Sequence, residues 1–211
     1  MTKASLIRSF SPAATLATVS RFIRARNLAA IACLLFTSMC CVASESTSAD
    51  HPIQVTARKN GETITVDAVF NVSATQQQAW DVLTDFEHMP HYVPNLESSN
   101  VIRRSGNIVQ VAQKGRQSYG PLSFPFDNLR EVELNPYSEI RSRLISGSMQ
   151  RSDGTTRLSQ TGGVTQVIYH GVFVPNVSVP SFLGIPAIES VTRQQFEGLR
   201  REIERRPGDQ R

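Results

Sequence analysis

The feature that most constrains the fold is a series of alternating strand patterns, separated by turn signals and followed by one long amphipathic helix. Asn60-Gly61, Ser105-Gly106-Asn107, Asn135-Pro136, Ser152-Asp153-Gly154 and Gly162-Gly163 are turn signals of this kind. Short connections join antiparallel neighbours. The pattern therefore predicts an α+β fold built on one antiparallel sheet of about six to eight strands. Strands are predicted at 53–58, 63–72, 98–104, 108–118, 124–134, 138–146, 155–161 and 164–174, with a bulge near Asn128.

A long helix is predicted at 187–206, with Pro186 allowed in its first turn. Its apolar residues recur at helical spacing, and the opposite face is rich in Arg and Glu. Such an apolar face must pack on something, and the open face of the sheet is the only large candidate. Because a twisted, curved sheet seldom meets one helix along its whole length, we expect a gap between the sheet and the helix.

The stretch at 73–96, between the second and third strands, is expected to close the end of that gap. Ser73 and Gln76 fit a capping box, which begins a short helix with one apolar face. Pro90 and Pro94 exclude one long helix after it, because each proline removes a backbone donor and restricts the residue before it. Two interpretations of the large apolar residues here stay open: they fill the core, or some of them line a cavity.

Residues 1–44 have the composition of a targeting leader. They contain five Lys or Arg, no acidic residue, and an apolar run at 28–36 that is too short for a permanent membrane span. We expect a signal peptide and export to the periplasm or outside the cell. An organelle transit peptide is the alternative, and Cys40 or Cys41 would be the acceptor in a lipoprotein. A flexible lead-in at 45–52, one domain at 53–206 and a disordered tail at 207–211 are expected to follow.

Composition argues against several functions once the leader is set aside. The chain has 22 Lys and Arg against 18 Asp and Glu, but five of the basic residues lie in the leader. The rest has no basic excess, which argues against nucleic-acid binding. All three cysteines also lie in the leader, so the predicted domain has no disulfide, thiolate catalysis or Cys metal site. No Gly-rich phosphate loop or nucleophile–base motif is present, and no cofactor is expected.

Several segments together resemble a known family. They lie at 72–74, 80–85, 90–96, 98–101, 104–107 and 169–180 and in the final helix, and the likeness extends over about residues 62–205. The chain resembles the START-like (SRPBCC, helix-grip) superfamily, and within it the polyketide cyclase/dehydrase and coenzyme-Q-binding branch. The resemblance implies a curved antiparallel sheet wrapped around a long C-terminal helix, with short helices after the first long strand. It also implies a cavity for a hydrophobic ligand, such as a lipid, quinone, steroid or polyketide, usually without a catalytic residue.

Few residues suggest chemistry of their own. His88 and His91 are spaced like a metal pair, but the proline between them and the lack of a third ligand favour loop histidines over a metal site. Asp85 is a general base if it is buried beside apolar groups, and otherwise it orients the turn that follows. Tyr169 and His170 are neighbours on one predicted strand and therefore face opposite sides, so that either can place one polar group in a pocket.

We predict a non-enzymatic carrier or sequestering protein for an apolar small molecule, with lipids and isoprenoid quinones as the leading classes. Transient membrane contact is compatible with this role, and the sequence does not fix the oligomeric state. One alternative is a cyclase or dehydratase that uses Asp85, His170 or Tyr169 as acid or base. Another is an interaction module that docks the turn at 89–96 on a partner or membrane, with an exposed apolar patch and no internal void. The predicted lining residues are Trp80, Leu83, Phe86, Met89, Tyr92, Val93, Phe124, Phe126, Ile140, Tyr169, Phe173, Phe182, Leu183 and Phe196.

Overall fold

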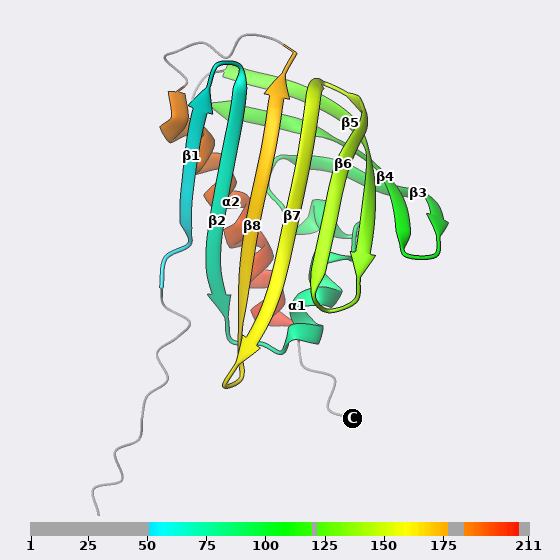
Figure 1. Ribbon diagram of the computed structural model, residues 1–211, viewed down its shortest axis with the longest axis vertical. Helices are drawn as coiled ribbons and strands as arrows, with labels where there is room; N and C mark the ends of the chain where they lie inside the picture. The colour runs from blue at the N-terminus through cyan, green and yellow to red at the C-terminus, as the bar shows by residue number, and fades with distance from the viewer. Residues whose placement is uncertain (1–50, 120–121, 177–183, 207–211) are drawn as a thin grey trace, which may run out of the picture. The chain divides into compact units, whose positions relative to one another are not determined.

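Eight strands form one antiparallel sheet that curves around a long C-terminal helix (Figure 1). The computed structural model describes residues 51–119, 122–176 and 184–206. The spatial order of the strands is β1-β2-β8-β7-β6-β5-β4-β3, so β1 and β3 are the two edges. This arrangement confirms the predicted α+β helix-grip fold. The strands are β1 (Gln54–Asn60), β2 (Thr63–Val72), β3 (Leu96–Ser105), β4 (Ile108–Tyr119), β5 (Leu122–Asn135), β6 (Glu139–Gly147), β7 (Met149–Thr161) and β8 (Val164–Pro175).

One face of the sheet supplies much of the hydrophobic core. Along β2 the side chains alternate between buried and half-buried positions, as the two-residue period of a strand requires. The buried set is Ile64, Val66, Ala68, Phe70 and Val72. Phe70 packs against Phe196 of the C-terminal helix, with ring centroids 5.4 Å apart. The same alternation that predicted the strand therefore also fixes which of its faces is turned toward the helix.

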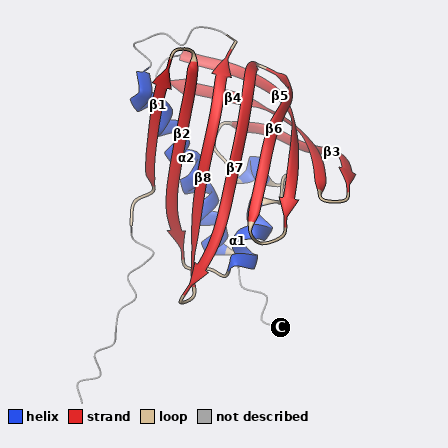
Figure 2. Cartoon of the chain, in the orientation of Figure 1, coloured by secondary structure: helices blue, strands red, loops and turns tan. Residues whose placement is uncertain are grey.

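The helix α2 (Gly184–Arg205) lies along the inner face of the sheet (Figure 2). Hydrogen bonds attach it to the β1 edge. The backbone N–H of Ala57 donates to Glu189 Oε1 at 2.8 Å, and Arg193 Nε donates to the carbonyl of Ile53 at 3.3 Å. In the described part of the chain, no hydrogen bond joins α2 to β3 through β8. The apolar stripe predicted from helical spacing is buried, and its members are Ile188, Val191, Phe196, Leu199 and Ile203.

Two short helices follow β2, α1 (Gln76–Leu83) and the single turn η1 (Met89–His91). The predicted capping box at Ser73 and Gln76 is wrong by two residues. Thr75 is the N-cap, because its backbone is extended while its side chain accepts from the N–H of Gln78, and the Gln78 side chain accepts from the N–H of Thr75. Gln76 is the first helical residue instead, and its side-chain amide donates to the carbonyls of Tyr137 and Leu158.

The turn predicted at Ser152-Asp153-Gly154 is also wrong, because β7 runs straight through this segment. Gly154 pairs with Ser142 of β6 and with Gly171 of β8. Close packing rather than a turn favours glycine here, since a Cβ at Gly154 would lie 3.2–3.3 Å from the ring and hydroxyl of Tyr169. Glycine occurs both in turns and where another group packs closely against the backbone, so the sequence alone does not distinguish the two.

The bulge predicted in β5 near Asn128 is in β6 instead. Residues of β5 pair with β4 without interruption, whereas the pairing with β6 shifts between Leu129 and Arg130 so that Ile145 is skipped. Because β5 alternates without a break, its inner face includes Asn128 and Arg130, while Leu129 points outward. Because the extra residue is in β6 and not in β5, two polar side chains of β5 face the inner side of the sheet.

Several predictions concern residues outside the described ranges. They include the leader at 1–44, the tail at 207–211, most of the lead-in at 45–52, and the lining residues Phe182 and Leu183. Within the described ranges, neither α1 nor α2 has the length and apolar character of a membrane-crossing helix.

Candidate functional site

A cavity of about 320 Å³ lies between the inner face of the sheet and α2. The wall opposite the sheet is largely apolar, because α2 presents its buried stripe there and the η1 turn adds further side chains. This apolar wall consists of Met89, Val93, Ile188, Val191, Phe196 and Leu199, and Leu96 at the start of β3 adjoins it. The cavity therefore forms where sequence periodicity predicted a gap between sheet and helix.

The sheet side of the cavity carries a polar wall beside the apolar side chains of Val66, Phe126, Met149 and Phe173. Six side chains from four strands form this polar wall: Gln113, Gln117, Asn128, Arg130, Ser152 and Tyr169. Gln113 and Asn128 are register partners across β4 and β5, so their side chains are neighbours on the same face. Gln117 Oε1 is buried without a hydrogen-bond partner in the described part of the chain. A buried acceptor left in this state favours a ligand or water that can donate to it.

Tyr169 occupies a position made possible by two glycines. A Cβ on Gly171 would overlap its hydroxyl and ring carbons, and Gly154 lies beside the same ring. The ring packs against Phe196 of α2, with centroids 5.2 Å apart. Burial raises the pKa of Tyr169, and the positive charge of Arg130 acts in the opposite direction. The hydroxyl of Tyr169 is therefore protonated at neutral pH and acts as a donor toward the cavity.

The structure brings together six of the predicted lining residues. Met89, Val93, Phe126, Tyr169, Phe173 and Phe196 all line the cavity. Their part in ligand binding remains a prediction.

Six other predicted lining residues do not border the cavity. Their hydrophobicity is like that of the six that do, so it could not tell the two groups apart. Trp80, Leu83, Phe86 and Ile140 are in the solid core, where Trp80 packs edge-on against Tyr137. Phe124 is 37% exposed.

Tyr92, the last of these six, is turned away from the cavity. Its hydroxyl donates to the carbonyls of Val82 and Asp85 at 3.1 and 3.2 Å, which leaves its ring facing Arg206 rather than the ligand space.

The polar residues of the wall were missed, apart from Tyr169. The sequence predicts a bulge near Asn128 and no role for Gln113. Arg130 received no role at all. The signal that identifies them is strict alternation from Phe126 through Val132, which places Asn128 and Arg130 on the buried side regardless of their polarity.

Asp85 is not in the cavity. Its carboxylate contacts His88 Nδ1 at 2.6 Å and accepts from Arg206 Nη2 at 2.7 Å, in a charged hollow that also includes Glu202 and Arg205. Burial raises the pKa of Asp85, but the hydrogen bonds from His88 and Arg206 outweigh it and hold the pKa below its ordinary value. The ion pair with Arg206 ties the segment after α1 to the end of α2, which is a structural role.

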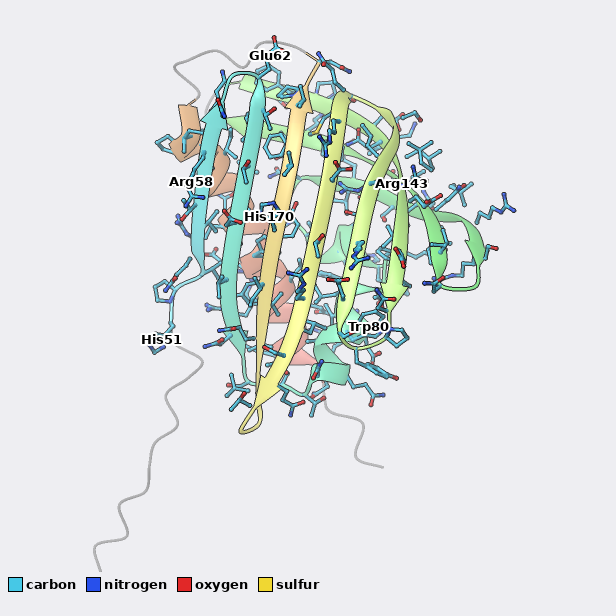
Figure 3. The ribbon with its side chains drawn as sticks, viewed as in Figure 1. His51, Arg58, Glu62, Trp80, Arg143 and His170 are labelled. Carbon is cyan, nitrogen blue, oxygen red and sulfur yellow. The ribbon has the colours of Figure 1, made fainter. Side chains whose placement is uncertain are left out.

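His170 lies on the outer face of the sheet, turned away from α2 (Figure 3). Its Nδ1 contacts Asp67 Oδ1 of β2 at 2.7 Å, and its side chain is exposed. The prediction that Tyr169 and His170 face opposite sides is confirmed. Of the three acid–base candidates, only Tyr169 borders the cavity. In the described ranges no group of three or more His, Cys, Asp or Glu is placed to hold a metal ion.

Comparison with known families agrees with this geometry. The model of a family described as polyketide cyclase/dehydrase and lipid transport matches residues 72–200. The chain belongs to this family. The matched segment runs from the end of β2 to within α2, and so includes most of the residues that line the cavity. The predicted resemblance to the START-like superfamily is confirmed.

Several solved structures share the fold of this chain at low sequence identity. A STAR-related lipid transfer protein from Xanthomonas axonopodis is 12% identical, with a TM-score of 0.59 over 74% of this chain and 100% of that chain. The Zhui aromatase/cyclase from a Streptomyces species is 16% identical, with a TM-score of 0.58 over 68% and 95%. A START superfamily protein from Mycobacterium smegmatis is 16% identical, with a TM-score of 0.53 over 66% and 94%. No curated protein matches the sequence.

Proposed function

We propose that this protein binds an apolar small molecule in the cavity between the sheet and α2, and that it carries or sequesters the molecule without changing it chemically. The observation that carries the proposal is the cavity itself, which lies in the range of volumes typical of small-molecule sites. At roughly 30 Å³ per non-hydrogen atom, its 320 Å³ would hold about ten such atoms. A short lipid chain or the ring of an isoprenoid quinone is of this size.

The composition of the lining supports binding over catalysis. Among the described residues that border the cavity, none is a His, Asp, Glu or Cys, so no side chain there is suited to accept a proton at neutral pH. Tyr169 is a hydrogen-bond donor because its pKa is raised by burial. The same fold is found in a lipid transfer protein and in an aromatase/cyclase, so the fold alone does not decide between these roles.

The interaction-module hypothesis is less well supported. It requires the apolar residues of the η1 turn to be exposed as a docking patch. Met89 and Val93 are instead partly buried, pack against the core and line the cavity. We further propose export of the protein, for which the basic, acid-free leader with its apolar run is the support.

Isothermal titration of the purified full chain with decanamide, a neutral straight-chain amide, tests the proposed binding. Burial of its apolar surface, at about 25 cal/mol per Å² before the cost of association, should give measurable affinity. Val191→Phe adds bulk inside the cavity and should weaken binding roughly tenfold or more, equivalent to about 1.4 kcal/mol.

Ile168→Phe is the matched control for this experiment, because Ile168 is 39% exposed and does not border the cavity. It should bind decanamide like the wild type. Equal affinities of the two Phe variants would show that the bound amide is not in the cavity. Native mass spectrometry of the same preparation, with extraction of whatever copurifies, identifies the natural ligand.

A further inference from the structure

The charge of Arg130 has no anionic partner in the described part of the chain. Arg130 is half-buried on the cavity side of β5, and its Nη2 donates to Ser142 Oγ at 2.7 Å. Other arginines of the sheet are paired with carboxylates on the outer face, such as Arg143 with Glu131 at 2.7 Å and Arg157 with Glu139 at 2.8 Å. A half-buried guanidinium that faces a cavity without a counter-charge is a favourable place for an anion to bind.

Arg130 is held close to Tyr169. A side chain added at Gly154 would lie 3.1 Å from Ser142 Oγ and 3.3 Å from the hydroxyl of Tyr169, so these two oxygens lie on either side of the same glycine. Ser142 in turn accepts the hydrogen bond from Arg130. The guanidinium and the phenol therefore approach one region of the polar wall, and the phenol has no hydrogen-bond partner in the described ranges.

The charged and most of the polar side chains of the cavity are on its sheet side, among apolar residues such as Phe126 and Phe173. The polar wall offers the donors of Arg130 and Tyr169, whereas α2 and the η1 turn offer only apolar surface, apart from Thr192 and Gln195. A ligand that is apolar throughout would leave the charge of Arg130 without a partner. A ligand with one acidic end and one apolar end would offer a carboxylate to Arg130 and apolar surface to α2 and the η1 turn.

We propose that the cavity binds an amphipathic organic acid, with its carboxylate held by Arg130 beside the Tyr169 hydroxyl and its apolar body against α2 and the η1 turn. This assignment rests on the proposed function, since it names the class of ligand for the same cavity. A planar guanidinium is well suited to a carboxylate because it donates two parallel hydrogen bonds.

The test compares decanoate with decanamide, which have the same chain length and differ in charge, by isothermal titration with the purified full chain. Wild-type protein should bind decanoate about tenfold more tightly than decanamide, as expected for hydrogen bonds to a charged group. Arg130→Met should remove this preference by weakening decanoate binding about tenfold, and it should weaken decanamide binding by less than that. Arg143→Met, a matched change on the outer face, should keep the preference.

The outcomes separate this assignment from the proposed function. If wild type binds both compounds equally, or if Arg130→Met keeps the preference for decanoate, the assignment is overturned and the carrier function stands. If neither compound binds, the carrier function itself is overturned. The comparison of the two ligands on wild type needs no variant, so a folding defect in Arg130→Met would not prevent a decision.

Discussion

Replacing Gly198 by alanine should destabilise the protein, although the same change stabilises most helices. Gly198 is buried in α2 where the helix meets the turn at 92–94. A Cβ there would overlap the backbone carbonyl of Tyr92 and lie 3.0 Å from Pro94 Cδ. A backbone atom cannot rotate away as a side chain can, so the helix and the turn must separate.

The size of the effect follows from two opposing terms. Gly to Ala in a helix interior gains about 1 kcal/mol. Overpacking against a fixed neighbour costs up to about 3 kcal/mol. The net loss of up to about 2 kcal/mol corresponds to a Tm lower by up to roughly 4–8 °C for a domain of this size. Thermal unfolding followed by circular dichroism measures it. Gln194→Ala, at an exposed position of the same helix, is the control and should change stability by less than about 0.5 kcal/mol. A Gly198→Ala protein as stable as wild type, or more stable, would show that α2 does not pack on this turn.

Two further predictions concern the charged hollow and the start of α1. Hydrogen bonds from Arg205 and Arg206 lower the pKa of Glu202 from 4.5 to about 2, so the stability it contributes is complete above about pH 4.5 and is lost as the pH falls toward 2. The free energy of unfolding, measured with urea across this pH window, should depend less on pH for Glu202→Gln than for the wild type. The same pH dependence in both proteins would contradict the ion pairs of Glu202. Thr75→Ala should lower the free energy of unfolding by about 1 kcal/mol, because it removes the N-cap of α1. Ser73→Ala should lower it by less than about 0.5 kcal/mol. A larger loss for Ser73→Ala would instead support the capping box predicted from the sequence.

The architecture was predictable because its signals are periodic and local. Alternation along β2 and the helical spacing of Ile188, Val191 and Phe196 each specify both an element and its buried face. Once one open sheet and one amphipathic helix are expected, their packing against each other follows. The boundaries were less certain, as Thr75 and Gly154 show, because capping and turn residues are small, common and interchangeable in sequence.

The lining of the cavity was only half predictable, for a physical reason. A large apolar side chain such as Trp80 or Phe126 satisfies the same hydrophobic requirement in a solid core as at the wall of a cavity, and sequence does not distinguish the two. The polar wall was missed for a different reason. The bulge expected near Asn128 would interrupt the alternation of β5, whereas β5 alternates without a break and turns Asn128 and Arg130 inward.

The attachment of α2 at two separate places has a consequence for which molecules fit. Glu189 accepts from the backbone N–H of Ala57 and Arg193 donates to the carbonyl of Ile53, which fixes the helix to the β1 edge. The ion pair of Arg206 with Asp85 fixes the end of the helix to the segment after α1. A guest thicker than the cavity would have to strain these contacts, so selectivity should depend on the girth of the guest as well as on its head group.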